Sequence, residues 1–321
     1  MIGWLSRRLR PSPRRGVAVH APLLTPADIA QLAAQGRQLA LSQPRPMQTR
    51  RAGDRPAPRL GHGLDFETSR PYLPGDDIRH MDWRTTARSG RAYLRLYREE
   101  RQPNLHLVID RGPAMRFGTR RRLKAAQAAR VAVLLACAGA AARYSIGVSL
   151  WGEGDVRLPA REGEGAADAL ARAAARACPP WAATAAPTAA HRYTERLGSL
   201  LAQLPQGGRL VMVSDFAWLA PGHWPLLARL AAHGELWAVG IADPAERQLP
   251  DMGVALFHDL QAGRQYWVDT RLTAAQLASA FARRQTELSA RLQALGARYW
   301  LVGSEEEALL SRFAAYAQSA H

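Results

Sequence analysis

Lysine is nearly absent from this chain of 321 residues, since Lys124 is the only one among 43 basic residues. The formal net charge is nevertheless +16, because all the other basic residues are arginines. A positive balance of this size is typical of proteins that bind nucleic acid or an anionic membrane surface. Alanine is abundant throughout, which indicates that a composition bias accounts for part of the arginine content. The net charge alone therefore does not predict phosphate binding.

Cysteine is scarce as well. Cys137 and Cys178 are the only two, and no metal-ligand spacing joins them. This usage is typical of a protein kept in a reducing compartment, with its thiols packed as ordinary side chains. We therefore expect a cytoplasmic protein.

Long hydrophobic runs are also missing. The longest apolar run, residues 131–142, has 12 residues, whereas a helix needs about 20 to cross a bilayer. The apolar stretch before the first arginines is too short to form the hydrophobic region of a signal peptide. We expect no membrane-spanning segment. Trp4 and Leu5 beside Arg7 would suit peripheral contact with an anionic membrane, although a frayed terminus explains the same residues.

Arginine is concentrated in the first part of the chain. Residues 1–60 hold 11 arginines and two aspartates, a net of +9. A hydroxyl, a proline and an acid between Thr25 and Asp28 predict a helix over residues 26–41. Residues 43–60 contain four prolines and no hydrophobic period, which predicts a linker. We expect the helix to form a lever or lid beside the main domain.

Strand and helix patterns alternate after residue 93. Strands are predicted at residues 93–97, 105–110, 144–151, 209–215, 235–241, 254–260, 264–270 and 298–302, with a short hairpin partner near Val156. Helices are predicted at residues 121–143, 192–204, 224–233 and 274–295, with one more at the end. This alternation predicts an α/β fold with a doubly wound, mostly parallel sheet and helices on both faces. Asp110 and Asp215 end two buried strands, so both should lie at the carboxyl edge, where such sheets bind ligands.

The stretch PGDDIRHMDWRTTAR at residues 74–88 gathers three aspartates and three arginines around one tryptophan. A metal-dependent nuclease would use such acids together with a lysine or histidine base. The only lysine lies 42 residues beyond Asp82, and only His80 is local. Each aspartate has an arginine close in sequence, so ion pairs and Asx turns explain the cluster better than catalysis does.

Residues 61–110 closely resemble the signature of the bacterial domain of unknown function 58 family, which is von Willebrand factor A-like. The shared elements are GHG, an acid followed by Phe, then Arg, Tyr, GDD, Arg, DW and AR, all in register. A looser likeness extends to about residue 303. The resemblance implies a von Willebrand A-like domain over residues 103–321. The signature segment, residues 61–102, and the helix and basic linker of residues 1–60 would precede it.

The resemblance also implies where a magnesium ion would bind. Such domains usually hold Mg²⁺ through Asp-x-Ser-x-Ser, a later threonine and a later aspartate. The matching positions here are Asp110, Gly112, Ala114 and Asp215, with Thr188 or Thr194 at the threonine. Two hydroxyl ligands are replaced by Gly112 and Ala114, so we expect a degenerate site without tight Mg²⁺ binding. Arg111 is then expected to neutralise the carboxylates in place of the ion.

The resemblance implies a non-enzymatic adaptor without a cofactor. Its partners would be a MoxR-type AAA+ ATPase, the usual genomic neighbour of this family, and an unknown client protein. We expect Trp83 to pack the signature segment onto the main domain. Fixed arginines and carboxylates would form the recognition surface. The residues of this predicted surface and its support are Arg70, Tyr72, Gly75, Asp76, Asp77, Arg79, Asp82, Trp83 and Arg88.

Two other functions stay open at this point. Residues 50–59 carry four arginines that could bind nucleic acid, but no aromatic residues alternate with them to stack on bases. A metal-dependent hydrolase would use Asp76, Asp77 and Asp82. Salt-dependent binding would identify the first function, and a phosphodiesterase assay the second.

Overall fold

The computed structural model describes residues 22–39, 41–42, 64–73, 77–99, 103–152, 154–178, 190–259 and 264–318. These residues form two compact units. The main unit consists of the described residues within 1–47 and 103–321, and the signature unit consists of those within 48–102.

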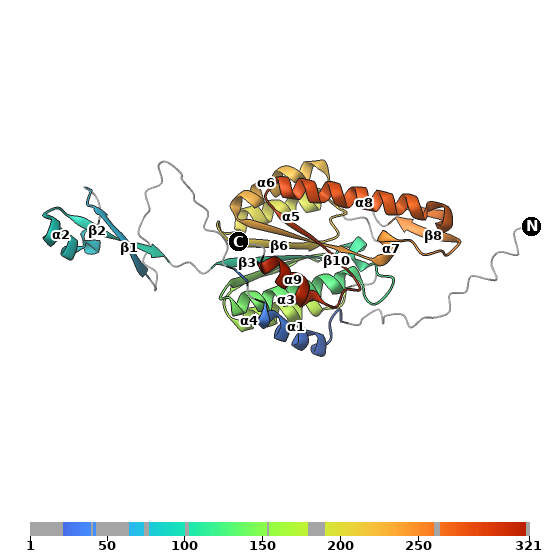
Figure 1. The fold of residues 1–321 in the computed structure, drawn as a ribbon, viewed down its shortest axis with the longest axis horizontal. Helices are drawn as coiled ribbons and strands as arrows, with labels where there is room; N and C mark the ends of the chain where they lie inside the picture. The colour runs from blue at the N-terminus through green and yellow to red at the C-terminus, as the bar shows by residue number, and fades with distance from the viewer. Residues whose placement is uncertain are drawn as a thin grey trace, which may run out of the picture. The chain divides into compact units, whose positions relative to one another are not determined.

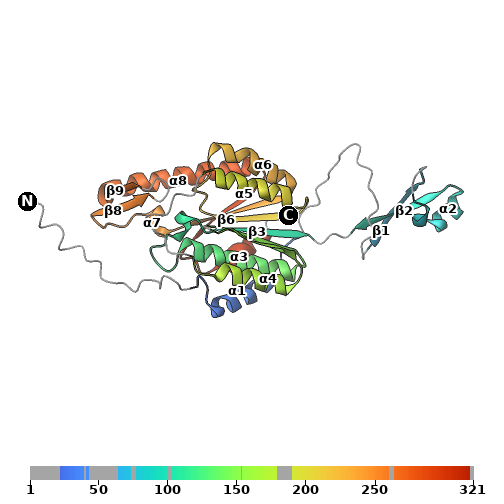
Figure 2. The same ribbon diagram turned by 180° about the vertical axis from the view of Figure 1, so that it is seen from behind.

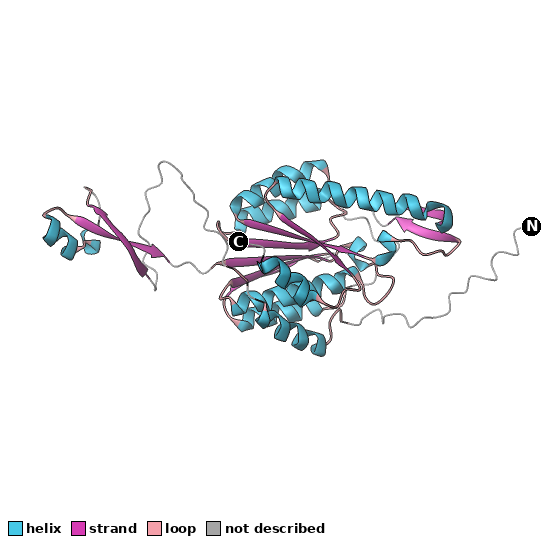
Figure 3. Cartoon of the chain, viewed as in Figure 1, coloured by secondary structure: helices cyan, strands magenta, loops and turns pink. Residues whose placement is uncertain are grey.

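A six-stranded sheet runs through the main unit in the order β10-β7-β6-β3-β4-β5 (Figures 1 and 3). Its strands are β3 (Asn104–Asp110), β4 (Ser145–Trp151), β5 (Val156–Arg161), β6 (Arg209–Ser214), β7 (Glu235–Ala242) and β10 (Arg298–Gly303). Only the pair β4-β5 is antiparallel, and the other four pairs are parallel. The predicted mostly parallel sheet is therefore confirmed.

Helices cover both faces of this sheet (Figures 1 and 2). One face carries α1 (Pro26–Gln38), α3 (Lys124–Ala141), α4 (Glu164–Ala175) and α9 (Leu309–Gln318). The other face carries α5 (Ala190–Gln203), α6 (Trp224–His233) and α8 (Thr270–Ala294). Short helices η2 (Pro113–Arg116), η3 (Pro221–His223) and α7 (Pro244–Arg247) follow strands β3, β6 and β7. Every residue of β6 is buried, as expected for a strand covered on both sides.

Helix α3 is the central helix of the main unit. Sixteen consecutive residues, from Lys124 to Gly139, are buried. By length and composition this helix could cross a membrane, but 83% of it is buried inside the unit. Its many alanines let neighbouring helices approach closely, so α3 forms the core layer between the sheet and the outer helices.

Helix α1 packs directly on α3, and the expectation of a free lever or lid is wrong. Leu32 and Gly36 of α1 are buried. A side chain at position 36 would place its Cβ 2.6 Å from the Leu134 carbonyl oxygen, so only glycine allows this close approach. The predicted capping box is confirmed: Asp28 N donates to the Thr25 hydroxyl at 3.1 Å, and Thr25 N donates to the Asp28 carboxylate at 2.9 Å.

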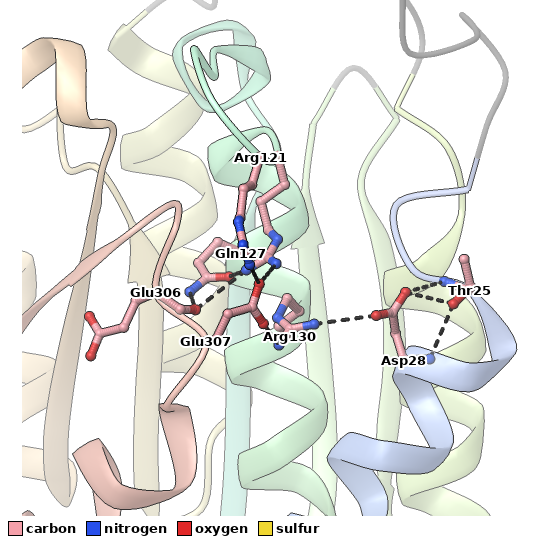
Figure 4. A network of polar contacts seen from close by, with 8 residues as sticks. Thr25, Asp28, Arg121, Gln127, Arg130, Glu306 and Glu307 are labelled. Atoms are coloured by element: carbon pink, nitrogen blue, oxygen red, sulfur yellow. Dashed lines mark hydrogen bonds and ion pairs between the residues drawn. The ribbon is translucent and has the colours of Figure 1, made fainter.

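A polar network ties α1 and α3 to the loop before α9 (Figure 4). The Arg130 guanidinium of α3 lies 3.4 Å from the Asp28 carboxylate and 3.0 Å from the Glu307 carboxylate. Glu307 also accepts from Arg121 at 2.9 Å and from Arg122. Because the Arg130 side chain is only 5% exposed, these contacts compensate for the burial of a charge.

A β-hairpin formed by β8 (Val254–Asp259) and β9 (Arg264–Asp269) leads into α8. One face of the hairpin exposes apolar side chains, since Leu256 and Trp267 are paired across the strands and are 48% and 67% exposed. Leu272, at the start of α8, is 76% exposed. No residue of α8 between Thr270 and Leu288 is buried. This end of the main unit therefore presents an apolar face to solvent.

The signature unit is a two-stranded antiparallel sheet of β1 (Leu64–Pro71) and β2 (Tyr93–Glu99). The connection between the strands contains η1 (Ile78–His80) and α2 (Trp83–Ser89). Helix α2 ends at Gly90, whose φ of 69° is the left-handed conformation that glycine adopts without strain. The predicted strand at residues 93–97 is confirmed, whereas β1 was not predicted.

Candidate functional site

Three carboxylates lie at the carboxyl edge of the sheet. Asp110 ends β3, Asp215 follows β6 and Asp243 follows β7. These strands are adjacent in the order β7-β6-β3 and run parallel, so their ends meet at one edge, which is where ligands of such sheets bind. The placement of Asp110 and Asp215 is as predicted. Asp243 was missed, although the sequence places it directly after a buried strand.

The Asp110 carboxylate is fully engaged by its own surroundings. It accepts a hydrogen bond of 2.6 Å from the Ser214 hydroxyl and one of 2.8 Å from Gly112 N. The side chain is buried at 2% exposure. Burial, with a further contribution from the neighbouring Asp215 carboxylate, raises the pKa of Asp110 to about 6. The fold thus holds this carboxylate in a place that disfavours its charged form.

Gly112 stands where the resemblance implies a serine, and the structure supplies the reason. A side chain at position 112 would place its Cβ 3.0 Å from the Tyr193 hydroxyl and 3.1 Å from the Asp110 carboxylate. A serine hydroxyl therefore has no room to turn toward a metal ion. Ala114 lies in η2 and has no oxygen in its side chain. Of the threonine candidates, Thr194 is an exposed residue of α5, and Thr188 lies outside the described residues.

Arg111 does not neutralise these carboxylates, so that prediction is wrong. Its guanidinium donates to the carbonyl oxygens of Arg176 at 2.6 Å and Ala177 at 3.0 Å, and to Cys178 Sγ at 3.2 Å. These contacts use the guanidinium to fasten the end of α4. Asp110 and Arg111 are consecutive residues at the end of β3, and successive side chains of a strand point to opposite sides. The Arg111 guanidinium is therefore directed away from the Asp110 carboxylate.

The cation beside the carboxylates is Lys124. Its Nζ donates to the Asp215 carboxylate at 2.8 Å and to the Glu246 carboxylate at 2.7 Å. Lys124 is 1% exposed. Burial alone would lower the pKa of this lysine, but the Asp215 and Glu246 carboxylates outweigh burial and raise the pKa above its usual value. The lysine is therefore a permanent positive charge inside the site.

Asp243 is also satisfied from within the fold. It accepts from Thr119 N at 2.9 Å, from the Ser304 hydroxyl at 2.9 Å and from Ala245 N at 3.0 Å. The Thr119 hydroxyl donates to the same carboxylate. Burial raises the pKa of Asp243, but these hydrogen bonds outweigh burial and lower it below its usual value. Asp243 therefore acts as a fixed anchor that holds the loop after β3, the end of β10 and α7 together.

An aromatic cluster covers the Asp110 side of this edge. Trp218 Nε1 donates to the Ser214 hydroxyl at 3.0 Å, and the Trp218 ring stacks on Tyr193 with centroids 4.6 Å apart. The Arg196 guanidinium lies 4.9 Å from the Tyr193 ring centroid and is itself bound to Asp155 at 2.6 and 2.8 Å. Aromatic rings and an occupied arginine thus close the approach to Asp110.

The carboxyl edge does not fit a bound metal ion. Among the described residues, no group of three or more His, Cys, Asp or Glu side chains is placed to hold one. The oxygen atoms that would coordinate Mg²⁺ already accept hydrogen bonds from Ser214, Gly112 and Lys124. A hard divalent ion needs about six oxygen ligands, and Lys124 carries a positive charge into the same space.

The signature residues divide into a buried support and an exposed surface. Asp82 belongs to the support, which the prediction included beside the surface itself. It is 4% exposed. It caps α2 by accepting from Thr85 N at 3.2 Å, and it also accepts from the hydroxyls of Thr85 at 2.8 Å and Ser69 at 2.7 Å. This aspartate holds the connection against β1.

The exposed part contains an aromatic residue that we expected to be packed. Trp83 is 66% exposed, so it is not packed inside the signature unit, and its packing on the main domain stays a prediction. Asp77 caps η1 through a 2.9 Å bond from Arg79 N, and both residues are exposed. Arg88 is exposed on α2. Asp77, Arg79 and Arg88 are thus exposed charged residues of the same unit as Trp83.

The remaining residues of the predicted surface are Tyr72, Arg70, Gly75 and Asp76. Tyr72 follows β1 and is half-buried, with its backbone N–H bound to Ala92 O at 2.8 Å. Arg70 lies in β1, opposite Leu94 of β2. Gly75 and Asp76 lie outside the described residues. The described signature residues therefore come from one short sheet and the connection between its strands.

Comparison with protein families gives one match. The model of the family described as "Protein of unknown function DUF58" matches residues 68–291. The match covers most of the signature unit and five of the six strands of the main sheet, and it ends within α8, before β10. Both units thus belong to a single family pattern.

Relatives and solved structures are similar to parts of this chain. "Uncharacterized protein Rv1480" of Mycobacterium tuberculosis is 32% identical over 270 residues, which cover 79% of this chain and 80% of that protein. "Uncharacterized protein MAV169" of Mycobacterium avium is 31% identical over 93 residues, 28% of this chain and 53% of that protein. BatB from Bacteroides thetaiotaomicron has a TM-score of 0.41 at 13% identity and covers 68% of this chain and 100% of that one. An aerotolerance-related membrane protein from Bacteroides fragilis has a TM-score of 0.44 at 13% identity and covers 67% of this chain and 97% of that one.

Proposed function

The chain belongs to the DUF58 family, and from this premise we propose that it is a non-enzymatic adaptor that binds other proteins through the signature unit. The observation that carries the proposal is the exposure of Trp83 at 66% on the most specific segment of the sequence. Tryptophan and arginine are the residues that most often dominate the binding energy of protein interfaces. A tryptophan exposed among charged side chains is thus best explained by a partner.

The surroundings of Trp83 support a protein partner. Leu73 and Ile78 are 60% and 61% exposed in the same unit. Arg79, Arg88 and Asp77 are exposed as well. Protein interfaces typically have a buried apolar centre and a polar rim. Apolar side chains in the same unit as exposed arginines and a carboxylate match this composition. Because Asp82 fixes α2 to the strand, these side chains are presented in a defined arrangement, which lowers the entropy lost on binding.

The state of the strand-end carboxylates supports a role without catalysis. A catalytic acid or base must reach the reacting atoms with a free lone pair or proton. Asp110 and Asp243 are held by hydrogen bonds within the fold, and Asp215 is held by Lys124. Ligands of parallel sheets usually bind at this edge, and here internal side chains occupy it.

The resemblance of the signature to the von Willebrand A-like group guides the choice of partner. We propose that the main unit is a von Willebrand A-like domain whose metal site has degenerated. The partner would be a MoxR-type AAA+ ATPase, and the pair would act in a chaperone-like manner to assemble or activate a client protein in the cytoplasm. The exposed apolar face of the β8–β9 hairpin, with Leu256 and Trp267, gives the main unit a separate surface for contact with a client.

Co-purification with a MoxR-type ATPase of the same organism tests this proposal. Trp83→Ala should weaken the association by about 30-fold or more, the loss typical of a central interface tryptophan. The double variant Asp77→Ala/Arg79→Ala should weaken it as well. All these side chains are exposed, so thermal unfolding should stay cooperative.

The chain offers a matched control in Trp267→Ala, because Trp267 is 67% exposed but lies on the main unit. This variant should keep the wild-type affinity for the ATPase. If Trp83→Ala and the double variant both co-purify with the ATPase at wild-type yield, the signature unit is not the binding surface. If wild-type protein binds no MoxR-type ATPase, the choice of partner is wrong.

A further inference from the structure

Lys124 sits where an ordinary lysine would be unfavourable. It is the first residue of α3, a helix of 18 residues. The amino end of a helix carries a partial positive charge, so a buried ammonium group there is repelled. The capping residue, Leu123, makes no side-chain hydrogen bond that would offset this. The carboxylates of Asp215 and Glu246 are the ion-pair partners that favour the ammonium at this place.

The use of lysine is itself informative in this chain. Arginine fills every other basic position. Arginine carries a broad planar group with donors in a fixed fork, whereas lysine ends in a compact charge that donates in three directions. Two of these directions are taken by Asp215 at 2.8 Å and Glu246 at 2.7 Å, and the Phe117 ring lies 6.0 Å away. The space is therefore suited to a small cation.

We propose that the Lys124 ammonium group is a tethered cation, which takes the place of a bound metal ion between the carboxylates of Asp215 and Glu246. The single ammonium group bridges both carboxylates without an ion from solution. Recognition of a partner at this edge through a metal-bridged carboxylate is thereby precluded. This inference concerns the main unit alone and does not depend on the identity of the partner.

The tethered cation explains why three neighbouring strand ends can each carry an aspartate. Asp215 is 8% exposed and Asp110 is 2% exposed, and two like charges this deeply buried would repel each other. Lys124 neutralises Asp215, while hydrogen bonds from Ser214 and Gly112 satisfy Asp110. Removal of the ammonium group should therefore leave a vacant, negatively charged site that a free cation can fill.

Cation rescue of Lys124→Ala tests the proposal. Propylammonium replaces the deleted atoms of the side chain, and Mn²⁺ is a small divalent ion that accepts oxygen ligands. Wild-type protein should change its Tm by less than about 1 °C in either cation, because its site is filled. Lys124→Ala should gain roughly 3–6 °C at ten times the dissociation constant of the cation, and the gain should rise with the logarithm of the cation concentration. Sodium chloride at the same ionic strength should not reproduce this gain.

Two further variants sharpen the test. Lys124→Ala/Asp215→Asn lacks a carboxylate of the site, so its gain in Mn²⁺ should be lost. Lys124→Arg should be less stable than wild type, since the planar guanidinium does not fit the space of the ammonium. If Lys124→Ala is recovered unfolded, refolding in propylammonium should restore folded protein. Equal stabilisation of wild type and variant by Mn²⁺, or no rescue of Lys124→Ala by either cation, would overturn the proposal.

Discussion

Replacement of Glu307 by alanine should loosen the attachment of α1 to the main unit (Figure 4). Glu307 holds the Arg130 guanidinium at 3.0 Å, and the other carboxylate partner, Asp28, lies 3.4 Å away. Loss of one partner of a fully buried ion pair costs about 3–5 kcal/mol. Glu307 is 47% exposed, and water screens part of this interaction, so we expect a loss of about 1–2 kcal/mol. For a unit of this size the Tm should fall by roughly 2–8 °C.

Two comparisons separate the buried contact from general surface effects. Arg121→Ala removes an arginine that is 64% exposed and contacts the same Glu307 carboxylate, so it should cost less than about 0.5 kcal/mol. Arg130→Met removes the buried charge itself, and within the described residues the Arg130 Nε has no hydrogen-bond partner. An apolar side chain of similar length avoids the cost of desolvation. Arg130→Met should therefore be less destabilising than Glu307→Ala.

The assay is thermal and urea unfolding of the full chain, with amide hydrogen exchange of α1 as the local probe. Burial raises the pKa of Glu307, but hydrogen bonds from Arg122 and Arg121 outweigh burial and lower it below its usual value of 4.5. A carboxyl group with a lowered pKa stabilises the fold above its unfolded pKa, and this contribution is lost as the pH falls. The difference between wild type and Glu307→Ala should therefore shrink below pH 4.5. A Glu307→Ala loss no larger than that of Arg121→Ala would refute this account of the network.

Three further predictions address other parts of the fold. Gly36→Val should destabilise the main unit by about 1–3 kcal/mol, because a Cβ there would lie 2.6 Å from the Leu134 carbonyl oxygen. Urea unfolding measures this loss, and an unchanged free energy of unfolding would contradict the close packing of α1. Asp82→Ala should remove the cap of α2 at a cost of about 1–2 kcal/mol, seen as faster hydrogen exchange in α2, and unchanged exchange would refute its role as support. Burial raises the pKa of Asp110 from 3.8 to about 6. The stability of wild type relative to Asp110→Asn should therefore be highest below pH 4 and fall by about 3 kcal/mol as the pH rises to 6. If the stability of wild type relative to Asp110→Asn rises over this pH range, the assignment is contradicted.

The sequence predicted the regular elements where the local pattern and the tertiary environment agree. The helix at residues 224–233 appears with those bounds as α6, and the apolar runs before Asp110 and Asp215 became β3 and β6. Helix α4 was missed, although it buries one face with Leu170 and six alanines. Strand β1 was missed because its polar residues resemble a loop, and pairing with β2, 22 or more residues later, makes it a strand.

The candidate site shows where sequence proximity misleads. Arg111 is adjacent to Asp110 in the chain, yet its guanidinium binds the carbonyl oxygens at the end of α4. The cation that serves the carboxylates, Lys124, meets Asp215 across 91 positions of sequence. Only the fold brings these two residues together. The one signal available was compositional, since a single lysine in an arginine-rich chain marks a position with a specific requirement.

The signature segment shows the same limit in another form. Its spacing identified the family, and the turn and cap roles of Asp77 and Asp82 follow from local chemistry. Exposure could not be derived in this way, because an aromatic residue beside a helix cap is equally compatible with a core or a surface. Trp83 is exposed, and the prediction that it packs on the main domain stays a prediction.

Hydrogen exchange of the full chain with and without a MoxR-type ATPase tests the central claim most directly. The account predicts slower exchange in residues 77–92, around Trp83, when the ATPase is bound. Residues 254–269, in the apolar hairpin, should exchange at the same rate in both states. Protection confined to the hairpin or to the carboxyl edge of the sheet, with no change in residues 77–92, would contradict the assignment of the signature unit as the recognition surface.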